Sequence, residues 1–162
     1  MKARISPILL LILVITVFPI FPQQLETFDR LVDFSITLKD LNLLSEARLK
    51  EIINDKKLVI INGSVASILI INKEENNFAA ELELIQGEWE GIEEVKIFRC
   101  IVRLNGAHFA PRLQVHRSRE KHPDAIELNS SILVVGKLVE IKNQPNESPL
   151  PVLEGIYIRQ IR

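Results

Sequence analysis

Long apolar runs rich in β-branched residues, each with an internal glycine, dominate the hydrophobic pattern of this 162-residue chain. The longest is Leu58–Ile71, with Gly63 near its middle, and the runs at 132–141 and 151–161 have the same form. β-branched runs of this kind favour strands, and an interior glycine in a strand marks a bulge or a sharp bend. The pattern therefore predicts coiled strands of a small, curved barrel, with Gly63 at a bulge.

Two further strands are predicted between these runs. Phe78–Trp89 alternates apolar residues with glutamates, and Val95–Leu104 follows after a glycine-containing turn. Alternation with a period of two is typical of strands that bury one face. Together with the glycine-centred runs, these segments make five strands between residues 58 and 162.

A strand and one α-helix are predicted ahead of the barrel. Apolar and polar residues alternate over 32–38, whereas apolar residues follow helical spacing over 40–57, with Asp40 or Ser45 as the N-cap. Residues 23–57 are therefore expected to form a linker, a strand and a helix packed on the barrel.

The five strands, with a long connection between the third and the fourth, resemble the OB-fold, a five-stranded Greek-key barrel. The long first strand of that fold pairs with the fourth, and both often carry a glycine, as do IINGSVASI at Gly63 and VVGKLVEI at Gly136. The resemblance covers 58–162. It departs from the usual pattern at 107–131, which shows no helical period where OB-folds commonly place a helix. The predicted fold class is mainly β, an OB-like barrel, and the alternative is another small barrel or sandwich.

The N-terminus predicts export. Lys2 and Arg4 precede an apolar run at 8–15, the arrangement of a signal peptide. No pair of small residues marks a cleavage site, so the alternative is an uncleaved membrane anchor at 5–21, about 25 Å long as a helix. Residues 1–22 are thus expected to be a signal peptide or an anchor, with the barrel on the periplasmic or extracellular side.

Charge and cysteine content exclude several classes of function. The net charge of −1 provides no overall basic field for nucleic acid. Cys100 is the only cysteine and lies in an apolar strand, which predicts a buried, unreactive thiol. His108, His116 and His122 do not have metal-ligand spacing, and no cofactor-binding or catalytic motif is present. The sequence therefore predicts a protein that is not an enzyme and has no cofactor or metal.

Five residues are candidates for ligand or partner contacts. Trp89 is the one tryptophan and could stack on a ligand, while Arg112, Arg117, Arg119 and Lys121 form a local basic cluster. Such a cluster could contact phosphate, anionic lipid or an acidic partner. The glutamates of the strand at 78–89 have the sign opposed to phosphate, which ranks nucleic acid low among the partners.

These observations predict an extracytoplasmic, non-enzymatic binding or scaffold module. Its expected partner is another protein of a bacterial cell envelope, bound through β-edge or loop contacts. The alternative is an OB-like domain that binds an oligosaccharide or another polymer through the loops at 72–77 and 142–150. Trp89 exposed beside those loops would favour stacking on a ligand, whereas Trp89 capping the barrel would be part of the core. Nucleic acid ranks below both.

Overall fold

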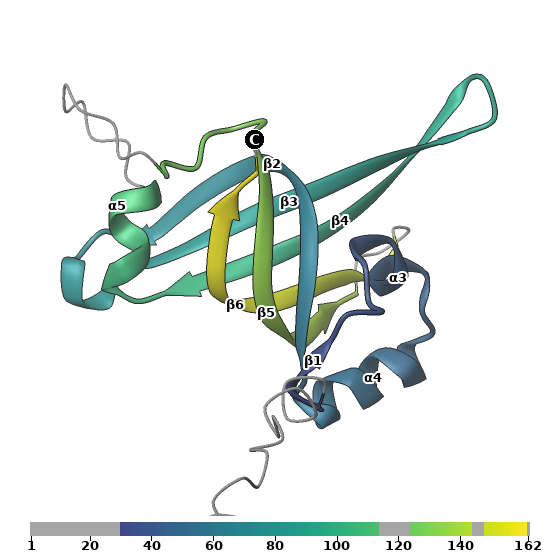
Figure 1. Cartoon of the computed structure of the whole chain (residues 1–162), viewed down its shortest axis with the longest axis horizontal. Helices are drawn as coiled ribbons and strands as arrows, with labels where there is room; N and C mark the ends of the chain where they lie inside the picture. Colours follow the sequence, from purple (N-terminus) through teal and green to yellow (C-terminus); the bar gives the residue numbers. More distant parts are fainter. Residues whose placement is uncertain (1–29, 114–123, 144–147, 162) are drawn as a thin grey trace, which may run out of the picture.

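A computed structural model describes residues 30–113, 124–143 and 148–161 of the chain. These residues form a six-stranded sheet that closes into a barrel, with short helices at its ends (Figure 1). The predicted signal peptide or anchor at 1–22 lies outside these residues, so export stays a prediction. Within the described ranges, no helix is both long and apolar enough to cross a bilayer.

Five strands close the barrel, in the order β2–β3–β4–β6–β5 and back to β2. The pairing of β4 with β6 is parallel, and the other four pairings are antiparallel. This connectivity is that of the OB-fold, so the predicted OB-like barrel is confirmed. The strands are β2 (Leu58–Asn72), β3 (Ala79–Glu90), β4 (Glu94–Asn105), β5 (Ser131–Lys142) and β6 (Leu150–Gln160).

Strand β2 belongs to two pairings, one along each half of its length. From Leu58 to Ser64 it pairs with β5, and from Ser64 onward it pairs with β3. The predicted partnership between the two glycine-bearing strands is therefore confirmed. A strand that changes partner in this way must bend sharply, because its two partners lie on different sides of the barrel.

The predicted bulge at Gly63 is wrong. Gly63 pairs with β5 in regular register, and the register shifts of β2 occur beyond Val65, against β3. A Cβ on Gly63 would lie 3.0 Å from the backbone oxygen of Ile85, closer than side chains ordinarily approach. The glycine therefore lets β2 and β3 come together where β2 changes partner, and this close approach replaces the expected bulge.

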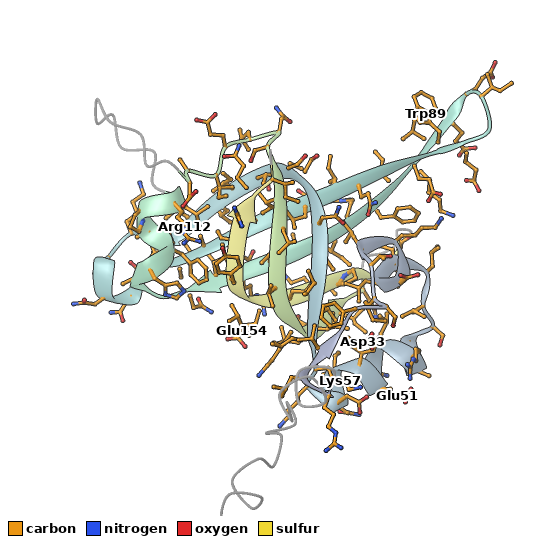
Figure 2. All side chains as sticks on the ribbon, in the orientation of Figure 1. Asp33, Glu51, Lys57, Trp89, Arg112 and Glu154 are labelled. Atoms are coloured by element: carbon orange, nitrogen blue, oxygen red, sulfur yellow. The ribbon has the colours of Figure 1, made fainter. Side chains whose placement is uncertain are left out.

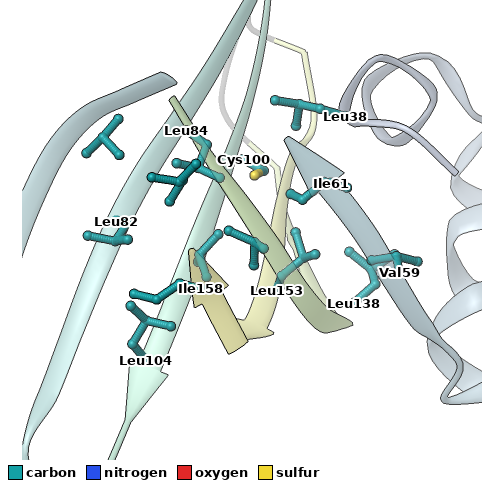
Figure 3. Packing of buried hydrophobic residues seen from close by; sticks show 14 of the residues in the cluster. Leu38, Val59, Ile61, Leu82, Leu84, Cys100, Leu104, Leu138, Leu153 and Ile158 are labelled. Carbon is teal, nitrogen blue, oxygen red and sulfur yellow. The ribbon is translucent and has the colours of Figure 1, made fainter. Parts of the chain in front are cut away.

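Alternate residues of all five strands fill the barrel with apolar side chains (Figure 3). Each fully buried aliphatic side chain contributes about 1.5–3 kcal/mol through removal from water. The thiol of Cys100 lies in this core, as predicted. Other members, which are contributed by the strands and by the N-terminal helix, are Leu38, Val59, Ile61, Leu82, Leu84, Leu104, Leu138, Leu153 and Ile158.

The N-terminal segment differs from its prediction in two ways. The strand is short, since β1 (Val32–Asp33) pairs in parallel with the start of β2 over two residues only. The single helix expected at 40–57 is two helices, α3 (Leu38–Leu43) and α4 (Glu46–Asp55). The reason is capping: Ser45 accepts a hydrogen bond from the backbone N–H of Arg48 and so begins a new helix.

Helix α3 begins one turn earlier than the pattern suggested. Thr37 is its N-cap, and Asp40 takes the third helical position, where its carboxylate accepts a hydrogen bond from the backbone N–H of Thr37. This reciprocal capping box satisfies two backbone donors. Short helical turns occupy the connections: η1 (Glu75–Asn77), η2 (Ala107–Phe109) and α5 (Ala110–Leu113).

Asn42 joins α3 to the edge of β4. Strand β6 pairs with β4 only from Ile101 onward and does not extend to Arg99. The Asn42 amide takes the place of a strand there: its Oδ1 accepts from the Arg99 N–H at 3.2 Å, and its Nδ2 donates to the Arg99 carbonyl at 3.0 Å. The same Nδ2 also bonds the Leu38 carbonyl at 2.9 Å.

Replacing Asn42 by alanine should destabilise the fold. Asn42→Ala removes both hydrogen bonds from the amide to the half-buried backbone of Arg99, which costs about 1–3 kcal/mol. Urea unfolding followed by circular dichroism measures the loss. Ser35→Ala, which removes an exposed hydroxyl that bonds only Asp33, is the control and should change the free energy of unfolding little. Equal stability of Asn42→Ala and the wild type would show that the amide is not a substitute for a strand.

Gly136 should tolerate a side chain poorly. A Cβ at this position would lie 2.6 Å from the backbone oxygen of Glu154, so β5 or β6 must shift to accept it. We expect Gly136→Ala to lower the free energy of unfolding by about 1–3 kcal/mol. Gly87→Ala is the matched control, because its Cβ would meet only a side-chain methyl of Val95, at 3.3 Å. The prediction fails if the two alanine variants unfold at the same urea concentration.

Candidate functional site

The hairpin formed by β3 and β4 extends well beyond the barrel (Figure 1). Pairing of β3 with β2 stops at Ile85, and pairing of β4 with β6 begins only at Ile101, whereas β3 and β4 pair with each other as far as Glu90 and Glu94. The outer part of the hairpin is therefore a two-stranded ribbon. Such a ribbon is only marginally stable by itself, so its base must be held by the rest of the fold.

One face of this ribbon is apolar and exposed. Trp89 lies directly opposite Val95, and Ile97 is the next residue of β4 on the same face, opposite Gly87. The side chains of Trp89, Val95 and Ile97 are 71%, 42% and 56% exposed. We call these three residues, with Gly87, the hairpin face. An exposed apolar patch with an aromatic side chain is characteristic of a binding surface.

The opposite face of the ribbon is charged and rests on α3. Lys39 of α3 forms a salt bridge of 2.6 Å with Glu88, and its Nζ lies 5.9 Å from the ring centre of Phe98. An open pocket of about 200 Å³ lies here, and the residues that line it are Lys39, Leu43, Glu88, Trp89, Glu90, Lys96 and Phe98. Together with the Asn42 bonds, these contacts join the base of the hairpin to α3.

Charges on the outer side of the barrel occur as pairs. Arg99 bonds Glu83 at 2.8 Å, and Arg103 bonds both Glu81 at 3.1 Å and Glu140 at 2.8 Å. These pairs are partly exposed, so each contributes little to stability. The pairs matter more for ligand binding than for stability, because the glutamates cancel the positive charge that would attract a phosphate. The outer face of β3 and β4 is close to neutral beside the hairpin.

Trp89 is exposed, but not where the sequence placed it. It lies near the end of β3, whereas the loop at 72–77 precedes the start of that strand, at the other end of the barrel. Trp89 therefore does not lie beside the loop at 72–77. Trp89 instead belongs to the hairpin face, whose other side chains, Val95 and Ile97, were not singled out from the sequence.

The basic cluster is only partly described, and its described member has a structural contact. Arg112 donates a hydrogen bond of 2.7 Å to the Ile158 carbonyl, and its guanidinium lies 5.7 Å from the ring centre of Tyr157. Figure 2 shows Arg112 and Trp89 at opposite ends of the molecule. Arg117, Arg119 and Lys121 lie outside the described residues.

The thiol of Cys100 is not a candidate nucleophile. It is completely buried, and burial raises its pKa above the ordinary value, with a smaller contribution from the charge of Glu83. A thiol in that state stays protonated, and the thiolate is the reactive form. Among the residues that the structure describes, no three side chains of the metal-binding types come together.

No family model matches this chain, and no curated protein matches it. Solved structures with a similar fold do exist. A small single-stranded DNA-binding protein from Streptomyces coelicolor matches with 11% identity and a TM-score of 0.44, over 65% of this chain and 93% of its own. The second single-stranded DNA-binding protein of Mycobacterium smegmatis matches with 8% identity and a TM-score of 0.43, over 65% of this chain and 88% of its own.

A third match is the single-stranded DNA-binding protein of Plasmodium falciparum in complex with single-stranded DNA. It shares 14% identity with a TM-score of 0.41, over 65% of this chain and 94% of its own. The predicted scaffold, with an envelope protein as partner and nucleic acid ranked last, is contradicted by these matches, because the matching proteins are named for binding single-stranded DNA. The predicted location outside the cytoplasm is not tested by them. Likeness at this level of identity concerns the fold alone, so the function of this chain must be argued from its own residues. What is established is that the barrel is an OB-fold domain.

Proposed function

We propose that this protein binds single-stranded nucleic acid along the outer face of β3 and β4, as a binding module without catalytic activity. The observation that carries the proposal is the hairpin face, with Trp89 exposed on the extension of an OB barrel. OB-folds bind oligonucleotides and oligosaccharides on the face of their second and third strands. In this chain those strands are β3 and β4.

Stacking on Trp89 is the main contact in this proposal. A base that stacks on an exposed aromatic side chain contributes about 1–3 kcal/mol, whatever its identity, because every base has a π-face. Val95 lies beside the indole across the ribbon, and Ile97 follows it on β4. An apolar surface of this kind accepts the flat faces of bases.

The charge of the hairpin favours bases over phosphates as the contacting groups. The arginines beside the hairpin are paired with glutamates, and Glu88, Glu90, Glu93 and Glu94 surround its tip. A phosphate chain would therefore be held away from the ribbon, with its bases turned toward it. A duplex hides its bases and offers mainly phosphates, so single strands are the ligand that fits.

Removing the indole should weaken binding. We expect Trp89→Ala to raise the dissociation constant for a twelve-nucleotide single strand about tenfold, within the 1–3 kcal/mol of a stacked base. Trp89→Phe should keep most of the affinity. Tyr157→Ala, which removes an exposed aromatic residue near Arg112 at the other end of the molecule, is the control and should leave binding unchanged. Fluorescence anisotropy with the full-length chain and a labelled oligonucleotide measures the three variants.

Three results would overturn this proposal. They are equal binding by wild type and Trp89→Ala, equal affinity for a duplex of the same length, and no binding of any oligonucleotide. Saturable binding of an oligosaccharide in the last case would assign the hairpin face to a different polymer.

Salt should affect binding weakly. A protein releases counterions in proportion to the phosphates that it neutralises, with a slope of about −0.7 per contact on single strands. One or two such contacts predict a loss of affinity of less than about tenfold between about 50 mM and about 200 mM salt. A titration series by anisotropy gives the slope. A hundredfold loss would show that phosphate contacts dominate, and substitution of Arg117 and Arg119 would then test whether the basic cluster makes them.

A further inference from the structure

A groove lies on the outer face of the sheet where β2 changes partner. Ser64 is paired with Ser131 of β5 on one side and with Ile85 of β3 on the other. The groove has a volume of about 320 Å³. The residues that line it are Asn62, Gly63, Ser64, Ile85, Gln86, Gly87, Ser131 and Ile161.

The groove offers neutral hydrogen-bonding groups. Asn62 and Ser64 alternate along β2 with the buried residues Ile61 and Val65, so their side chains face outward. The side chains of Asn62, Ser64 and Ser131 make no hydrogen bond with any other residue in the described part of the chain. None of the residues that line the groove carries a charge. The groove can therefore donate and accept hydrogen bonds but cannot attract a phosphate by charge.

The groove opens directly onto the hairpin face. Gly87 belongs to both, and Trp89 follows two residues later on the same face of β3, about 7 Å along the strand. A Cβ on Gly87 would lie 3.3 Å from a side-chain methyl of Val95. Because glycine has no Cβ, no side chain stands between the groove and the hairpin face at this position. A ligand stacked on Trp89 can therefore continue into the groove without leaving the sheet.

We propose that this groove is a second nucleotide subsite, in which Asn62, Ser64 and Ser131 hydrogen-bond to the edge of a base. The inference rests on the proposed function and adds selectivity to it. Unpaired bases in a single strand expose their hydrogen-bonding edges, and amide and hydroxyl side chains read them. Stacking on Trp89 is tolerant of sequence, whereas the groove discriminates between bases.

The two surfaces predict different responses to mutation. The wild type should bind twelve-nucleotide strands of adenine, cytosine and thymine with affinities that differ by about fivefold or more. The double variant Asn62→Ala/Ser64→Ala should bring the three affinities to within about twofold of one another. Trp89→Ala should weaken all three equally and leave their ratios unchanged. Ser67→Ala, farther along the outer face of β2, is the control and should behave as the wild type.

Anisotropy titrations of the full-length chain distinguish the possible failures. If the double variant keeps the wild-type ratios, or if the wild type binds all three strands equally, the groove is not a base-reading subsite, while the effect of Trp89→Ala still supports the proposed function. If the wild type binds none of the strands, the proposed function itself is wrong and the subsite with it. We expect the double variant to fold, because both residues face outward. Circular dichroism and thermal unfolding check that it does.

Discussion

The shared pairing of β2 is the constraint on which the rest of this structure depends. One strand of 15 residues holds β5 along its first half and β3 along its second half, and so closes the barrel. The change of partner occurs at Ser64, directly after Gly63. Because Gly63 has no side chain, the backbone of β3 can approach at Ile85. A larger residue there would separate the two strands at the point where closure occurs.

The same change of partner creates the surfaces that we assign to a ligand. Since β2 leaves β3 unpaired beyond Ile85, the hairpin is free to extend, and its apolar face stays exposed. Helix α3 contacts the base of the hairpin through Asn42 and through the salt bridge of Lys39 with Glu88. The arginines nearby are paired with glutamates and further glutamates surround the hairpin tip, so stacking and hydrogen bonding, rather than attraction of phosphates, are the forces available for binding.

Much of the fold and one part of the site could be predicted from local sequence. Alternation placed the strands at 78–89 and 95–104 within one residue of β3 and β4, because one face of each strand is buried in the barrel. Trp89 was a candidate for a different reason: it is the one tryptophan of the chain and could stack on a ligand. Val95 and Ile97 also alternate with Lys96, but alternation alone does not distinguish an exposed apolar face from a buried one.

The pairing of the two glycine-bearing strands was implied by the resemblance to the OB-fold. Local sequence indicated the five barrel strands and offered Ser45 as an N-cap, because these follow from side-chain period and capping chemistry. It did not determine where each pairing ends. That depends on how far β2 and β6 extend beside the hairpin, which is a property of the closed barrel. Only the tertiary structure therefore decided that Trp89 is exposed, that Gly63 serves a close approach rather than a bulge, and that Asn62 and Ser64 share a groove with Ser131, 67 residues beyond Ser64 in the chain.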